Sequence, residues 1–144
     1  MEADGAEPAH LFVSGRRAPS AHRDERIHLR GDADLAAEMR RLDGTPPGLL
    51  DDPDVRRMFL RVMRDDYRAA ETYRYVPGPP LHCPVTALVG DRDPKVDLAE
   101  ASAWRDHTTG RFAMRVYDGG HFYLNSHQAA VLDTIRSSLA PAIR

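Results

Sequence analysis

The sequence contains one cysteine, Cys83, so no disulfide bond can form within the chain. A chain without internal disulfides is typical of a reducing compartment. No apolar run approaches the ~20 residues of a membrane-spanning helix. The acidic opening MEADGAEP also lacks the apolar stretch of a signal peptide. These absences favour a cytoplasmic protein with no membrane partner.

Lysine is nearly absent as well, because Lys95 is the one lysine among 20 basic residues. The formal net charge of −2 argues against a general nucleic-acid binder. The histidines show no spacing of the H-x-x-x-H type, and there is no cysteine pair to complete a metal site. We therefore expect no metal ion and assign surface or loop positions to His10, His22, His28, His82, His107 and His127.

Strand-like and helix-like segments alternate along the chain. Apolar runs predict strands near residues 10–14, 85–90 and 112–117. Helical patterns follow the first strand twice, at residues 31–44 and from residue 53, and follow each later strand once. Such alternation predicts a single α/β domain in which helices flank one parallel sheet, with its strands in sequence order and a two-helix insertion after the first.

The two inserted helices carry their own signals. For the first, Asp32 or Asp34 can supply the N-cap and Gly44 the stop. The second has Asp52 as N-cap and Pro53 in its first turn. Its expected apolar side comprises Val55, Met58, Phe59, Val62, Met63, Ala70 and Tyr73, with Asp66 inside that stripe. Its opposite side carries Arg57, Arg61, Arg64 and Arg68, a pattern that is usually a solvated face.

An acid and a histidine follow neighbouring strands. GDRDP leaves the strand at 85–90, and YDGGHF leaves the strand at 112–117, which places Asp93 and His121 at the same carboxyl edge of a parallel sheet. The order acid then histidine matches the α/β-hydrolase triad, in which the carboxylate orients the imidazole. From spacing alone, a glycine turn with an incidental histidine remains the alternative. We expect Asp118 to be a turn residue.

Several segments together resemble the type II thioesterases, which are α/β-hydrolases that accompany polyketide and nonribosomal peptide synthases. The matching segments are HLFVSGRRAP, FLRVMRDDYRAAETYRY, CPVTALVGDRDP, the helix of Trp104 and GGHFYL. The resemblance implies that Asp93, rather than Asp91, is the catalytic acid and that His121 is the catalytic histidine. It also implies that the helices between residues 31 and 75 form a lid over the acyl chamber.

The resemblance further implies an activity. The family removes aberrant acyl groups from the phosphopantetheine arms of acyl and peptidyl carrier proteins, without metal or redox cofactor. By it, the arginine side of the second helix (Arg57, Arg61, Arg64, Arg68) has a second interpretation as a contact for an acidic carrier-protein helix. Phe122 and Tyr123 are packing residues by default and could equally wall the site.

One family motif is missing, because the chain contains no G-x-S-x-G nucleophile elbow. The serines before Asp93 are Ser14 and Ser20, and RRAPSAHR behind Ser14 cannot form the helix that an elbow requires. We expect Ser14 to be a loop residue and Cys83 to be a buried core residue. Residues 1–144 therefore resemble the C-terminal part of an α/β-hydrolase. Two interpretations remain: a thioesterase whose sequence here starts late, or a non-catalytic remnant that at most binds a carrier protein.

Overall fold

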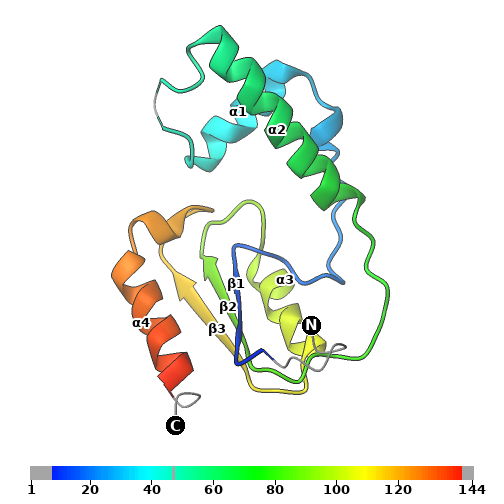
Figure 1. The fold of residues 1–144 in the computed structure, drawn as a ribbon, viewed down its shortest axis with the longest axis vertical. Coiled ribbons are helices and arrows are strands. Elements are labelled where there is room, and N and C mark those ends of the chain that lie inside the picture. The colour runs from blue at the N-terminus through cyan, green and yellow to red at the C-terminus, as the bar shows by residue number, and fades with distance from the viewer. Residues whose placement is uncertain (1–7, 47, 141–144) are drawn as a thin grey trace. The chain divides into compact units, whose positions relative to one another are not determined.

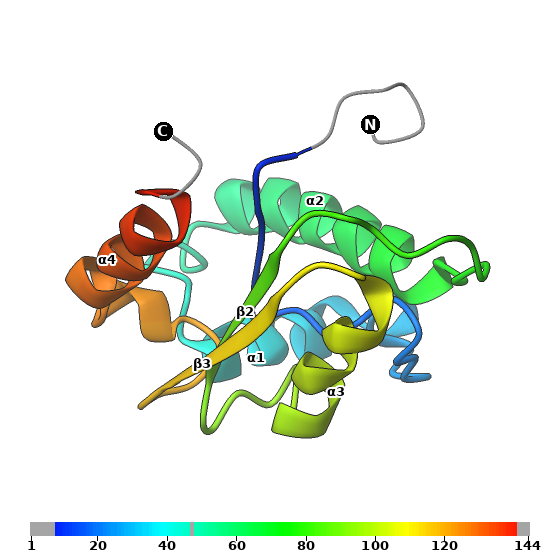
Figure 2. The same ribbon diagram turned by 90° about the horizontal axis from the view of Figure 1, so that it is seen from below.

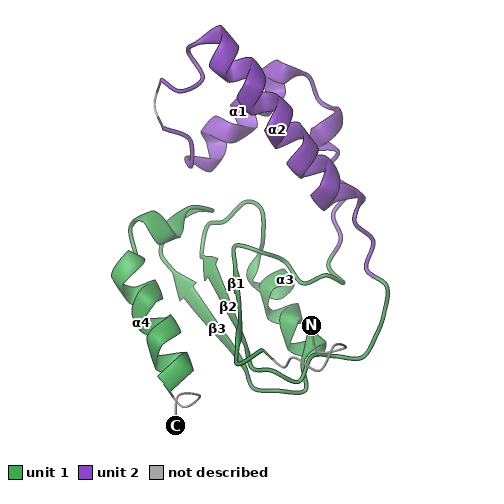
Figure 3. Cartoon of the chain, viewed as in Figure 1, with its two compact units in different colours: residues 1–21, 76–144 green, residues 22–75 purple. Residues whose placement is uncertain are grey.

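A computed structural model describes residues 8–46 and 48–140 and divides the chain into two compact units (Figures 1 and 3). The first unit joins residues 1–21 to residues 76–144, and the second comprises residues 22–75. The second unit contains both helices predicted between residues 31 and 75. Within the described residues, no helix has the length and apolar character needed to cross a membrane.

The first unit is built on a three-stranded parallel sheet. Its strands are β1 (Leu11–Ser14), β2 (Val85–Gly90) and β3 (Phe112–Tyr117), in that order. Leu11 lies opposite Val85, which in turn lies opposite Phe112. All six residues of β2 are buried, as the near-continuous apolar run of a central parallel strand requires. The predicted strand positions, order and direction are confirmed.

Helices lie on both faces of this sheet, with α3 (Leu98–Ser102) on one side and α4 (Gln128–Leu139) on the other (Figures 1 and 2). A capping box between Asp97 and Glu100 starts α3. The helical segment predicted after the second strand is α-helical only in its first part, because its second part tightens into the 3₁₀ helix η3 (Ala103–His107). On the α3 side, Val13, Val85 and Ala87 form a core with the half-buried Trp104.

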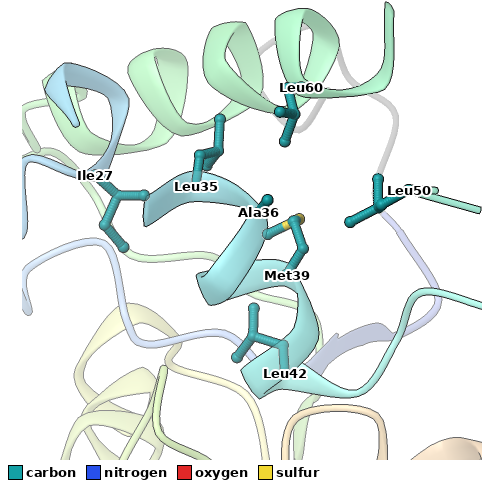
Figure 4. Close-up of a cluster of buried hydrophobic side chains, with 7 residues drawn as sticks. All are labelled: Ile27, Leu35, Ala36, Met39, Leu42, Leu50 and Leu60. Carbon is teal, nitrogen blue, oxygen red and sulfur yellow. The ribbon is translucent and has the colours of Figure 1, made fainter. Parts of the chain in front are cut away.

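The second unit packs η2 (Ile27–Leu29) and α1 (Asp32–Leu42) against α2 (Pro53–Thr72). Figure 4 shows its core, in which Leu60 of α2 points toward α1. The buried side chains are Ile27, Leu35, Ala36, Met39, Leu42, Leu50 and Leu60. The predicted ends of α1 were wrong: Gly31 holds the N-cap position, and Asp43 adopts the left-handed conformation at the C-cap. Asp32 and Asp34 lie within the first turn, where their negative charge suits the helix dipole.

The start of α2 is as predicted, because the Asp52 carboxylate accepts hydrogen bonds from two backbone amides of the first turn. Its predicted apolar side was partly wrong. Met58 and Val62 are 67% and 55% exposed, and Asp66 is exposed too. The buried face runs instead through Leu60 and Glu71, because α1 and η2 are the described elements that contact α2 most and they bury these residues.

Glu71 is the charged residue on the buried face of α2. Its side chain is 6% exposed and accepts hydrogen bonds from the backbone amides of Ile27, at 2.9 Å, and His28, at 3.1 Å. The imidazole Nδ1 of His28 bonds the same carboxylate. Burial by itself would raise the pKa of Glu71, but the hydrogen bonds from His28 and Ile27 outweigh burial and lower it. A buried charge on α2 is therefore satisfied by the turn that precedes α1.

Candidate active site

Asp93 and His121 meet at the carboxyl ends of β2 and β3. The Nδ1 atom of His121 lies 2.9 Å from Asp93 Oδ2 and 3.1 Å from Oδ1. The Asp93 side chain is fully buried, whereas that of His121 is 25% exposed. The backbone amide of Lys95 donates to Asp93 Oδ1 at 2.8 Å, which fixes the carboxylate from its other side. The arrangement holds one ring nitrogen and leaves the ring partly accessible.

The loops that carry these two residues touch backbone to backbone. A Cβ atom at Gly90 would lie 2.3 Å from the carbonyl oxygen of Gly120 and 2.5 Å from that of Gly119, so the close approach requires glycine. The amide of Arg92 donates to Gly119 O at 3.0 Å. In return, Asp91 Oδ1 accepts the Gly119 amide at 2.8 Å. Asp91 thus has a place in the loop contact, apart from the Asp93–His121 pair.

An exposed ion pair reinforces the same contact. Arg92 lies 2.6 Å from Asp118 Oδ1 and 3.2 Å from Asp91 Oδ2. The hydrogen bond from Arg92 lowers the pKa of Asp118. Asp118 therefore does more than occupy a turn, because it joins the acid loop to the histidine loop.

The two aromatic residues after His121 have different surroundings. Phe122 is 38% exposed and makes a T-shaped contact with the imidazole of His121, with ring centroids 5.2 Å apart. Tyr123 is buried, stacks on Tyr117 at 5.1 Å and bonds Ser14 Oγ through its hydroxyl at 2.7 Å. Burial raises the pKa of Tyr123, so its hydroxyl stays protonated at neutral pH. The expectation that Ser14 is a loop residue was wrong, since Ser14 is the last residue of β1.

The other side chains considered as nucleophiles have different partners. Ser20 Oγ lies 2.8 Å from His107 Nε2, and Cys83 is buried just before β2, at the opposite end of the sheet from the Asp93–His121 pair. Among the residues that the structure describes, no hydroxyl or thiol bonds His121 Nε2. Across the same residues, no group of three or more histidine, cysteine or acidic side chains is arranged to hold a metal ion.

The arginine side of α2 is not uniform. Arg57 and Arg68 are exposed and lie 3.2 and 3.7 Å from the acidic residues three positions before them, and Arg61 is exposed. Arg64 instead turns inward, where its guanidinium donates to the carbonyl oxygens of His28 and Arg30 and to the Asp32 carboxylate. Arg64 therefore holds the second unit together.

A family model and two sequence relatives all match this chain to thioesterases. Residues 1–139 match the family model described as a thioesterase domain. The chain is 48% identical over 141 residues to a probable cadicidin biosynthesis thioesterase of Streptomyces griseus, covering 98% of this chain and 39% of that protein. It is also 48% identical over 135 residues to the thioesterase PikA5 of Streptomyces venezuelae, covering 94% of this chain and 48% of that protein.

A solved structure agrees in fold as well as in sequence. The type II thioesterase BorB of the borrelidin biosynthetic cluster has 49% identity and a TM-score of 0.86, covering 96% of this chain and 57% of that chain. The chain thus spans roughly half the length of the relatives it matches, or less. It belongs to the thioesterase family and has the α/β-hydrolase fold, and the solved structures it resembles include type II thioesterases from a borrelidin cluster and from a yersiniabactin NRPS/PKS pathway.

Proposed function

We propose that Asp93 and His121 are the acid and the histidine of a Ser-His-Asp triad, in an enzyme that hydrolyses acyl thioesters on the phosphopantetheine arms of carrier proteins. The observation that carries the proposal is the hydrogen bond from His121 Nδ1 to the buried Asp93 carboxylate. The serine would come from a G-x-S-x-G segment outside these 144 residues, because none of the described serines bonds His121.

The chemistry follows from which ring nitrogen is held. With its Nδ1 proton donated to Asp93, His121 has a lone pair at Nε2 that accepts the proton of the serine hydroxyl as the oxygen attacks the thioester carbonyl. Asp93 stabilises the resulting imidazolium, which then gives its proton to the departing pantetheine thiolate. Water repeats the sequence on the acyl-enzyme and releases the carboxylic acid. Each step is a proton transfer or an acyl transfer, so the proposal includes no metal or redox cofactor.

The proposal assigns two further functions, the lid and the carrier-protein contact, to the second unit. Its two helices, between residues 31 and 75, would act as the lid over the acyl chain. The exposed arginines of α2 (Arg57, Arg61 and Arg68) would meet an acidic carrier-protein helix in the cytoplasm. Arg64 is less suited to that contact, because its guanidinium is engaged within the unit.

The test compares the 144-residue chain with a version extended upstream in its reading frame to include the elbow. The extended enzyme should hydrolyse short acyl thioesters, and Asp93→Asn and His121→Ala should each lower kcat by about 10⁴-fold. The control is Asp133→Asn on α4, because Asp133 is 74% exposed and should leave kcat unchanged.

Two results would overturn this proposal. Turnover by the 144-residue chain, abolished by His121→Ala, would place the nucleophile among the residues described above. DNA without an in-frame G-x-S-x-G upstream would instead favour the alternative, a non-catalytic remnant that binds a carrier protein.

A further inference from the structure

β1 ends in a glycine that lies directly against the Asp93–His121 pair. Gly15 has φ +57°, in the left-handed region that favours glycine, and its amide donates to Leu88 O at 2.9 Å. A Cβ atom at Gly15 would lie 3.2 Å from His121 Cε1, 3.3 Å from His121 Nδ1 and 3.5 Å from Asp93 Oδ2. The imidazole therefore closes on the bare backbone of a third strand.

We propose that Gly15 is a positioning residue for His121, a role that rests on the proposed function of that histidine. Asp93 holds the ring through one nitrogen only, at 2.9 and 3.1 Å from its two oxygens, and contacts to a single ring atom leave the ring free to tilt about that atom. The Gly15 backbone closes off movement toward β1. Together the two contacts direct Nε2 to one place, as proton transfer from an incoming hydroxyl requires.

A second contact ties the same two segments. Tyr123 follows His121 by two residues and bonds Ser14, which directly precedes Gly15, through the hydroxyl pair at 2.7 Å. The histidine loop is thus fastened to the end of β1 beside the point where the imidazole meets Gly15. The ring cannot move away from a side chain at position 15 by shifting the whole loop without breaking that bond.

A side chain at position 15 would consequently displace the imidazole of His121. Carbon atoms pack best at about 3.5–4.0 Å, so a Cβ atom at 3.2 Å displaces the ring by a few tenths of an ångström. Because an error of about 1 Å in a reacting group can cost about 10²-fold in rate, we expect Gly15→Ala to lower kcat about tenfold. Substrate binding does not pass through this contact, so KM should stay within about twofold.

Gly48→Ala is the matched control. Gly48 also has a positive φ, of +81°, so alanine introduces comparable backbone strain there. Among the described residues, its Cβ atom would meet Asp51 Oδ2 alone, at an ordinary 3.7 Å, within the second unit. Differences between the two variants therefore report the contact with His121 and not the left-handed backbone.

The first measurement needs no catalytic activity. Urea unfolding of the 144-residue chain at low protein concentration is compared for Gly15→Ala, His121→Ala and the double variant. Removing the imidazole should relieve the contact. The factor by which Gly15→Ala lowers the folding equilibrium constant should therefore be at least fivefold smaller in the His121→Ala background than in the wild-type background. Gly48→Ala should show no such dependence on His121. If Gly15→Ala folds only in the absence of the imidazole, the proposal is supported; equal cost or failure to fold in both backgrounds overturns it.

The second measurement tests positioning in the extended enzyme. Gly15→Ala should lower kcat with little change in KM. The ¹H NMR signal of the His121 Nδ1 proton should shift or broaden in the same variant. Gly48→Ala should leave kcat, KM and the Nδ1 signal unchanged. Unchanged kcat with an unchanged Nδ1 signal would overturn the proposal. If no extended enzyme is active, the proposed function fails, and the unfolding comparison still decides whether Gly15 holds the ring.

Discussion

Replacing Glu71 by glutamine tests how the second unit is held together. Glu71→Gln keeps the shape of the side chain but removes its charge and replaces one of its two acceptor oxygens by an NH2 group, which cannot accept hydrogen bonds. Ile27 is 2% exposed, so its amide has no access to water as a substitute partner. The His28 side chain is 13% exposed and can recover part of its hydration.

The expected cost follows from these contacts. A buried donor left without an acceptor costs about 1–3 kcal/mol, and hydrogen bonds to charged groups are worth about 1.5–3 kcal/mol. The remaining glutamine oxygen can serve either Ile27 or His28, but not both. With about 2 kcal/mol for the residue left without an acceptor and about 1 kcal/mol for the weaker, uncharged hydrogen bond at the other, we expect a loss of about 3 kcal/mol in the stability of the second unit. The control is Asp65→Asn on the same helix, whose ion pair with Arg68 is exposed and worth at most about 1 kcal/mol.

Amide exchange measured by mass spectrometry on peptides covering residues 22–46 and 48–75 is the suitable assay, because it reports this unit separately from the sheet. Exchange in these peptides should accelerate roughly 100-fold in Glu71→Gln and little in Asp65→Asn, since about 1.4 kcal/mol corresponds to a factor of ten. Equal protection in the two variants would refute the assigned role of the carboxylate.

The same carboxylate predicts a pH dependence with a definite sign. The pKa of Glu71 is lowered in the folded chain, so its contribution to stability is present above the ordinary glutamate pKa of about 4.3. That contribution is lost as the pH falls through the lower, folded-state value. The wild-type chain should therefore lose protection of the second unit in acid, and Glu71→Gln should lose less, because glutamine does not titrate.

Two further predictions concern the surfaces of the chain. Replacing Arg57 and Arg61 by glutamate in the extended enzyme should slow association with an acidic carrier protein several-fold at low salt. Turnover of a small acyl thioester should not change; equal slowing of both substrates would contradict a carrier contact. In the described residues, β1 pairs with β2 alone, which leaves its other edge open. The 144-residue chain should therefore self-associate through residues 11–14 on gel filtration, and a monomer with strongly protected amides there would contradict this.

Much of the sheet could be predicted from the sequence, because its signals are local. The run from Val85 to Gly90 is apolar throughout and is followed by a turn rich in aspartate and glycine, so the position of β2 and the polar edge after it follow from the pattern. The approach of Asp93 to His121 then follows from parallel strand topology, since neighbouring strands end at the same edge.

Other features depended on contacts distant in sequence. The buried side of α2 is set by what α1 and η2 cover, and Glu71, a residue type that is usually exposed, is buried because two backbone amides 43 and 44 positions away need an acceptor. The contact between Gly15 and His121 could not be predicted either, because FVSG gives no sign of the residue against which it packs. In the sequence the glycine signals only a chain turn.

The hydrogen bonds from Ile27 and His28 to Glu71 also bear on how the chain folds. β1 and β2 belong to one sheet, yet the whole second unit lies between them in sequence, so pairing them requires closure of a long loop. Once Glu71 holds the turn at Ile27, the chain enters and leaves the second unit at adjacent points, and the loop that remains to be closed is less than half as long. Each halving of a flexible loop lowers its closure entropy cost by about 0.6 kcal/mol. If the second unit forms first, it therefore lowers the entropy cost of pairing β1 with β2.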